Sequence, residues 1–155
     1  MSTLRLVSIA AVAIAATLAL IIFIPSEDTE TVMSLEQRES REIRFDKIKT
    51  AEDRIAFLSQ FGYTVETEAI EETEVVIPKE FDKVFAAYNE LQKAEGLDLG
   101  RYKGKKLMRY TYRVTNYPGY DKEVYASLLV YKNKVVGGDV CSLDPSGFAH
   151  GLTKR

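Results

Sequence analysis

The chain begins with an apolar run that stands apart from the rest of the sequence. From Leu6 to Ile24, 17 of 19 residues are apolar, and only Ser8 and Thr17 interrupt them. As a helix this segment would be roughly 28 Å long, which is close to the hydrocarbon thickness of a bilayer. The pattern predicts a transmembrane anchor over residues 1–25, which contacts the lipid bilayer through residues 6–24.

The charges that flank this segment predict its orientation. Arg5 precedes it, and the residues that follow include Glu27, Asp28 and Glu30. Positive charge stays on the cytoplasmic side, so residues 26–155 are expected outside the cell membrane. A cleaved signal peptide is the alternative. Its apolar run is usually only about 7–15 residues long and ends at a small-residue cleavage site, and no such pattern stands at this boundary.

The external part divides into a spacer and a domain. Residues 26–49 are polar and charged with few apolar residues at helical spacing, which predicts a stalk that is partly helical or disordered. An extracytoplasmic domain is expected over residues 50–152, and residues 153–155 form a tail. The domain should open with a helix that Thr50 caps and that Gly62 closes in a left-handed conformation.

Apolar spacing predicts a second helix further along the chain. Its core-facing stripe consists of Phe81, Val84, Phe85, Tyr88 and Leu91. Gly96 should end this helix. Between the two helices, alternation over residues 63–67 predicts a strand, and a second apolar run over residues 75–77 ends at a proline.

The last third of the sequence has the alternation of an antiparallel meander. Strands are expected from Met108 to Thr115, from Val124 to Val130 and from Val135 to Leu143. A reversal at Asn133-Lys134 joins the last two, and the glycine pair at residues 137–138 predicts a bulge or close packing. The fold class is therefore α+β, with two helices packed on an antiparallel sheet that ends in a three-stranded meander.

Four blocks of sequence together resemble a known family. They are RIAFLSQFGY (54–63), VVIPKEFDKVFAAYNELQKAEGLDL (75–99), LMRYTYRVTNYPG (107–119) and LLVYKNKVVGGDVCSLDPSGFAHGL (128–152). They resemble a domain of unknown function in small membrane-anchored proteins of clostridia and related Gram-positive bacteria, over about two-thirds of the chain. The resemblance implies an N-terminal transmembrane helix and one extracytoplasmic domain. It implies no activity and no catalytic residues.

Composition excludes several classes of function. With 21 basic and 23 acidic residues the net charge is −2, which does not favour a nucleic-acid binder. One cysteine cannot form an intramolecular disulfide, and four zinc ligands are hard to assemble from one cysteine and one histidine, so no metal and no cofactor are expected. The acidic residues of segment 66–74 are interpreted as a solvated strand edge. Calcium binding needs ligands clustered in a turn, whereas strand spacing scatters these carboxylates over two faces.

One group of residues near the C-terminus resembles catalytic chemistry. Cys141 and His150 could form a thiol–imidazole pair, with Asp139 nearby. The favoured interpretation is structural: Cys141 is a small buried residue, and His150 lies in a terminal loop that packs Phe148 and Leu152 back on the sheet. Asp139 either binds a cation or accepts backbone hydrogen bonds in a turn.

Tyrosines and basic residues are interleaved in the meander. Seven of the nine tyrosines fall between residues 102 and 131. Alternation places Tyr110 and Tyr112 in the core and the neighbouring arginines on the solvated face. The candidate binding surface comprises Arg109, Arg113, Tyr117, Tyr120 and Tyr125.

The sequence thus leaves two functional hypotheses. The leading one is a non-enzymatic binding or regulatory domain, tethered to the membrane, whose partner is an envelope protein, a peptide or an envelope polymer. The alternative is a small envelope hydrolase or thiol enzyme that uses Cys141 and His150.

Overall fold

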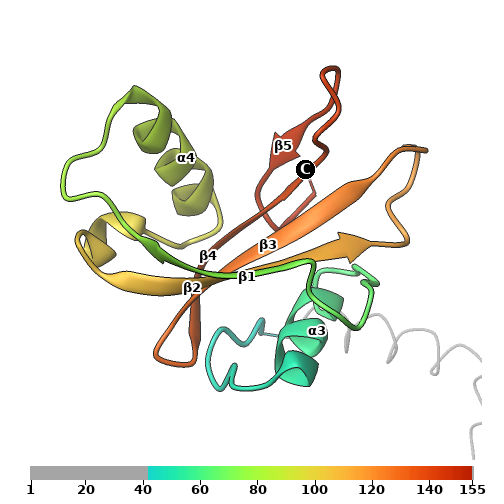
Figure 1. The fold of residues 1–155 in the computed structure, drawn as a ribbon, viewed down its shortest axis with the longest axis horizontal. Coiled ribbons are helices and arrows are strands. Elements are labelled where there is room, and N and C mark those ends of the chain that lie inside the picture. Colours follow the sequence, from blue (N-terminus) through green and yellow to red (C-terminus); the bar gives the residue numbers. More distant parts are fainter. Residues whose placement is uncertain (1–41, 155) are drawn as a thin grey trace, which may run out of the picture. The chain divides into compact units, whose positions relative to one another are not determined.

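Residues 42–154 are described by a computed structural model, and this part of the chain forms an α+β domain (Figure 1). Its elements in chain order are α3 (Ala51–Ser59), β1 (Glu71–Val76), α4 (Lys83–Ala94), the 3-10 helix η1 (Leu99–Tyr102), β2 (Lys106–Val114), β3 (Val124–Tyr131), β4 (Lys134–Cys141) and β5 (Ala149–His150). The predicted anchor over residues 6–24 lies outside the described residues. Among the helices that are described, none is long and apolar enough to span a bilayer.

The five strands form one antiparallel sheet in the order β1-β2-β3-β4-β5. The predicted α+β class and the meander β2-β3-β4 are confirmed. The strand expected over residues 63–67 is reduced to one bridge between Val65 and Val114. Strand β1 instead begins at Glu71 and includes acidic residues, because it is an edge strand whose charged side chains reach solvent. Strand β5 was not predicted.

The first helix begins as the sequence predicts. Thr50 is its N-cap: the Thr50 hydroxyl accepts from the Asp53 amide at 3.2 Å, and the Asp53 carboxylate accepts from the Thr50 amide at 2.9 Å. This reciprocal capping box satisfies donors that the first helical turn leaves unpaired. Gly62, at a φ of +84°, has the expected left-handed conformation just after the helix.

The apolar stripe predicted for the second helix is only partly correct. Phe85 and Tyr88 face the core, but Val84 is 78% exposed. The fully buried positions of α4 are the polar residues Asn89 and Gln92. Hydropathy could not place them inside, because their burial depends on hydrogen bonds to distant parts of the chain. Gly96 has a φ of +76° just beyond the end of the helix, as expected.

The two helices cover opposite faces of the sheet (Figure 1). Strand residues alternate between the faces, so the register separates two sets of side chains. On one face α3 covers a core that includes Tyr112, Leu128 and Val140. On the other, α4 and η1 cover a smaller core that includes Leu107, Leu129 and Val136.

The folded domain begins earlier than the predicted boundary at Thr50. Residues 43–49, which were assigned to the stalk, pack against the first core. Ile48 is only 6% exposed, and its amide donates to the carbonyl of Asn133 at 2.8 Å. Phe45 packs edge-on against Phe57 at 5.4 Å between ring centroids. Isolated apolar residues in a polar segment gave no periodic signal for this packing.

The β3–β4 hairpin has the predicted irregularities, displaced by one residue at the turn. Lys132 and Asn133 both have left-handed φ values, of 47° and 62°, as a type I′ turn requires. The register shifts after Leu129, which leaves an extra residue on β4 beside Gly137. The predicted bulge is therefore present. A Cβ at Gly137 would lie 3.1 Å from side-chain atoms of Leu129 and Leu99, so close packing is present as well.

Candidate functional site

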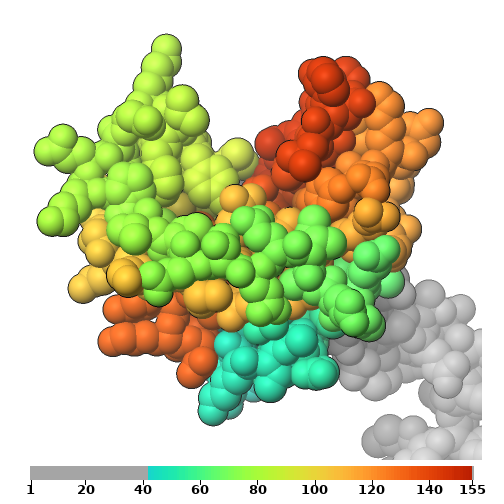
Figure 2. All heavy atoms as spheres, viewed as in Figure 1, coloured from blue at the N-terminus to red at the C-terminus, as the bar shows by residue number. Residues whose placement is uncertain are grey.

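A cleft of about 370 Å³ opens on the face of the sheet that α4 covers in part. Figure 2 shows it as the hollow between α4 and the β4–β5 hairpin, with β1 in front. Its apolar side is formed by Val75, Ile77, Phe85 and Leu129. Its polar side chains come from α4, β2 and β4 and are Tyr88, Arg109, Asp139 and Cys141.

Asp139 is the most constrained of these polar groups. The Tyr88 hydroxyl donates to its carboxylate at 2.8 Å, and the Cys141 thiol donates to it as well. Burial raises the pKa of Asp139, and these two hydrogen bonds together with the charge of Arg109 oppose that effect. Burial, followed by the charge of Asp139, likewise raises the pKa of Tyr88, which therefore stays a hydrogen-bond donor.

Arg109 supplies the positive charge of the cleft, and the contacts of its own guanidinium are long. One guanidinium nitrogen donates to the Ser127 hydroxyl at 3.4 Å, and another lies 3.9 Å from a carboxylate oxygen of Glu71. Both distances are long for an arginine contact. Within the described part of the chain, no ion pair joins Arg109 to Asp139, because β3 separates their strands.

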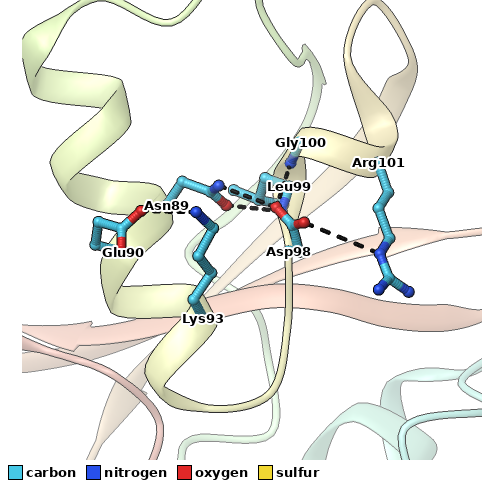
Figure 3. A network of polar contacts seen from close by, with 7 residues as sticks. All are labelled: Asn89, Glu90, Lys93, Asp98, Leu99, Gly100 and Arg101. Carbon is cyan, nitrogen blue, oxygen red and sulfur yellow. Dashed lines mark hydrogen bonds and ion pairs between the residues drawn. The ribbon is translucent and has the colours of Figure 1, made fainter.

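The position of α4, and with it one wall of the cleft, is fixed by two sets of buried polar contacts. Gln92 accepts from the Gly138 amide on β4 at 2.8 Å. At the turn into η1, Asn89 accepts from the Leu99 amide at 2.7 Å and donates to Asp98 at 3.0 Å (Figure 3). These hydrogen bonds pin the helix to the sheet and to η1, so Tyr88 is held where it reaches Asp139.

Cys141 and His150 do not come together. In the register of β4 and β5, Cys141 lies opposite Ala149 and Val140 lies opposite His150, so the thiol and the imidazole occupy different faces of the sheet. Burial and the charge of Asp139 raise the pKa of Cys141 above that of a free thiol. A thiolate nucleophile needs the opposite shift.

His150 belongs to an aromatic cluster on the other face. Its Nε2 hydrogen-bonds with the Tyr117 hydroxyl at 2.8 Å, and its ring stacks on Phe148 with centroids 5.4 Å apart. Phe148 packs against the first core, and Leu152 is fully buried there. The expected packing of this segment on the sheet is therefore observed, although part of it is strand β5 rather than loop.

The candidate binding surface of the meander is divided among three environments. Only Arg109 lines the cleft. Arg113 and Tyr125 both bind Glu123, at 2.7 and 2.5 Å. The remaining two tyrosines contact Phe148 in the aromatic cluster: Tyr117 stacks on it and Tyr120 packs edge-on against it. The contacts of these five residues thus fall into three groups. The sequence did not indicate that Tyr88 would be a polar group of the site, because its place in an apolar stripe predicted only packing.

The acidic segment forms separate ion pairs. Glu74 lies 2.9 Å from Lys106, Glu72 lies 3.5 Å from Arg54, and Glu66 lies 3.9 Å from Arg113. In the part of the chain that the structure describes, no three acidic, cysteine or histidine side chains are grouped so as to hold a metal ion.

Comparison with known protein families decides the relationship of the chain. The model of a domain of unknown function, DUF4830, matches residues 57–140. The chain belongs to this family. The predicted resemblance to a domain of unknown function is thereby confirmed. No curated protein and no solved structure matches the chain.

The DUF4830 match includes most of the cleft. Tyr88, Arg109 and Asp139 all lie within the matched residues. Cys141 and Ala149, which complete one side of the cleft, lie just beyond them. The opposed charges of the cleft are thus part of the DUF4830 domain itself.

Proposed function

We propose that the chain is a single-pass membrane protein whose extracytoplasmic domain is a binding or regulatory module without catalytic activity. The anchor is supported by the apolar run over residues 6–24, and its orientation by Arg5 before it and acidic residues after it. The resemblance to small membrane-anchored proteins of clostridia and related Gram-positive bacteria supports the same arrangement. The lipid bilayer is then the first partner of the chain.

The cleft on the α4 face is the binding site in this proposal, and it is the observation on which the proposal depends. Its volume of about 370 Å³ is within the range of small-ligand sites. An apolar wall beside a few convergent polar groups is the usual composition of such sites. A cleft of this size would receive a ligand about as large as one residue, either free or as part of an envelope protein, a peptide or an envelope polymer.

The chemistry of the cleft favours binding over catalysis. The raised pKa of Cys141 keeps its thiol protonated near neutral pH, and His150 occupies the other face of the sheet. Asp139 accepts a hydrogen bond from Tyr88, and its charge helps to raise the pKa of Cys141 instead of activating the thiol. A thiol enzyme would need an activated thiolate with a base beside it.

The anchor can be tested on the full chain in its native membrane. We expect the extracted protein to have the mass of all 155 residues and to fractionate with membranes. In intact cells, added protease should degrade the C-terminal domain. Loss of about 25 N-terminal residues, or protection of the domain in intact cells, would contradict this part of the proposal.

The cleft can be tested with a photo-crosslinking amino acid placed at two exposed alanines of the full chain. Ala149 borders the cleft, whereas Ala56 lies on α3 on the opposite face. We expect specific adducts in native membranes from position 149 and not from position 56. Adducts from position 56 alone, or the same adducts from both positions, would show that the partner binds elsewhere.

A further inference from the structure

The cleft presents two opposite charges, and no ion pair of residues 42–154 joins them directly. Arg109 on β2 and Asp139 on β4 both line it, with β3 between them. We propose that the cleft binds a free α-amino acid with an apolar side chain, whose carboxylate pairs with Arg109 and whose ammonium group pairs with Asp139. This inference rests on the proposed function and names the ligand of the same site.

Arg109 is suited to the carboxylate. Its contacts with Ser127 and Glu71, at 3.4 and 3.9 Å, are both longer than a good charge-assisted hydrogen bond. Its side chain is 41% exposed, so a ligand can reach it. A planar guanidinium binds a carboxylate through two parallel hydrogen bonds, and neither present contact uses that geometry.

Asp139 is suited to the ammonium group. Its neighbours are two hydrogen-bond donors, Tyr88 and Cys141, and the more distant positive charge of Arg109. None of these contacts is a direct ion pair. A bound cation that brings its own hydrogen-bond donors would stabilise the charged form of this carboxylate.

The rest of the cleft is suited to an apolar side chain. Four side chains form its apolar side. They are Val75 near the end of β1, Ile77 just after β1, Phe85 from α4 and Leu129 from β3. The ring of Phe85 also packs at a tilt against the ring of Phe81, with 4.6 Å between centroids, which keeps it in place. An aliphatic side chain bound there would contact hydrocarbon on several sides and be removed from water, which favours binding.

The alternative ligands each leave one charge uncompensated. A carboxylic acid without an amine would add a negative charge near Asp139 and Glu71 and leave Asp139 without a cation. An amine without a carboxylate would leave Arg109 with only its long contacts to Ser127 and Glu71. An internal residue of a peptide has neither free group. The pair of charges therefore selects a free amino acid over the interior of a chain.

The experiment is a calorimetric titration of the full chain, in lipid nanodiscs, with leucine and two analogues. Leucinamide lacks the carboxylate and 4-methylpentanoate lacks the ammonium group. We expect leucine to bind at least about tenfold more tightly than either analogue, and more tightly than glutamate or lysine. Equal binding of leucinamide or 4-methylpentanoate would overturn the two-charge recognition.

Two substitutions test which side chain of the cleft binds which charged group of the amino acid. Arg109→Gln should weaken leucine binding at least about tenfold. Asp139→Asn should abolish the preference for leucine over 4-methylpentanoate, a change in selectivity that mere loss of packing would not produce. Arg101→Gln is the control, because that arginine is 81% exposed and outside the cleft. Tyrosine fluorescence verifies that each variant is folded.

The outcomes separate this inference from the proposed function. Absence of amino-acid binding together with specific crosslinking at Ala149 would overturn the inference and leave the binding module intact. Leucine binding that survives both Arg109→Gln and Asp139→Asn would place the amino acid outside the cleft and overturn the inference as well.

Discussion

The two faces of the sheet are built from the same strands but carry different kinds of side chain. The α3 face is closed over a continuous core, with Tyr112, Ala126 and Leu128 fully buried. The α4 face is closed only over its smaller cluster and opens into the cleft beside it. There β2 and β4 place a partly exposed arginine and a half-buried aspartate instead of aliphatic residues.

This difference separates stability from function within one domain. The α3 face contributes mainly apolar burial, which is the dominant favourable free energy of folding. The α4 face retains a carboxylate whose burial disfavours its charged form, and such groups are typical of functional sites. Substitutions on the α3 face should therefore act mainly on stability, whereas those on the α4 face should act mainly on binding and change stability less.

The largest effect is expected when the same substitution, phenylalanine to alanine, is made on each of the two faces. Phe57 on α3 is 1% exposed, whereas Phe85 on α4 is only partly buried. We expect Phe57→Ala to lower the free energy of unfolding by about 3–5 kcal/mol, and Phe85→Ala by less than about half of that. Urea unfolding of the full chain followed by tyrosine fluorescence measures both, because all nine tyrosines lie between residues 63 and 131. Equal losses of unfolding free energy would show that the two faces contribute equally to stability, which would contradict this account.

The next effect concerns the one buried cation of the α3 face. Arg54 is 7% exposed, donates to the Tyr112 hydroxyl at 2.8 Å and lies over the Tyr110 ring at 3.7 Å. Tyr112→Phe removes the acceptor and leaves a buried donor unpaired, so we expect a loss of about 1–3 kcal/mol. Glu72→Gln is the matched control, because this second partner of Arg54 is exposed. If both variants unfold like the wild type, the hydroxyl is not what holds Arg54.

A smaller effect of opposite sign is expected at Asp139. The pKa of this carboxyl is raised in the folded state, so above that pKa its charge disfavours folding, and the penalty disappears as the pH falls toward 3.9, the ordinary pKa of aspartate. Asp139→Asn should therefore stabilise the domain near pH 7 and lose this advantage in acid. Unfolding midpoints between pH 4 and pH 8 measure the trend. A variant that is destabilised most at neutral pH would mean that the charge contributes to stability instead.

The smallest effect is expected outside both faces. Lys93 and Glu90 form an exposed pair one turn apart on α4, at 2.8 Å. Solvent screens such pairs, so Lys93→Gln should change neither the unfolding midpoint nor leucine binding measurably. A clear change in either quantity would show that the outer surface of α4 takes part in holding the cleft.

Much of the fold could be predicted from local sequence. Strict alternation from Met108 to Val114 placed Tyr112 in the core, and the Thr50 cap was visible from its spacing to Asp53. The buried face of α4 could not be predicted, because Asn89 and Gln92 are buried by hydrogen bonds to Leu99 and Gly138. Such long-range bonds leave no periodic pattern in the sequence.

The site was only partly predictable for a similar reason. Arg109, Asp139 and Cys141 are each chemically notable in the sequence, and strand alternation predicts a solvated face for Arg109, which lines the cleft with its side chain 41% exposed. Their proximity to Tyr88 depends on how α4 packs on the sheet, and the sequence pattern does not predict that packing. The pairing of Cys141 with His150 could be judged only from the β4–β5 register.

The central claim, that the cleft binds a ligand and performs no thiol chemistry, is tested most directly by the alkylation rate of Cys141. This is the only cysteine of the chain and it lines the cleft, so iodoacetamide reports on it without any substitution. The raised pKa predicts slow labelling at pH 7, a rate that keeps rising beyond the ordinary thiol pKa of about 8.5, and further slowing when leucine is added. Rapid labelling at pH 7 that no longer rises with pH would contradict the account, because it would show a thiolate poised for catalysis.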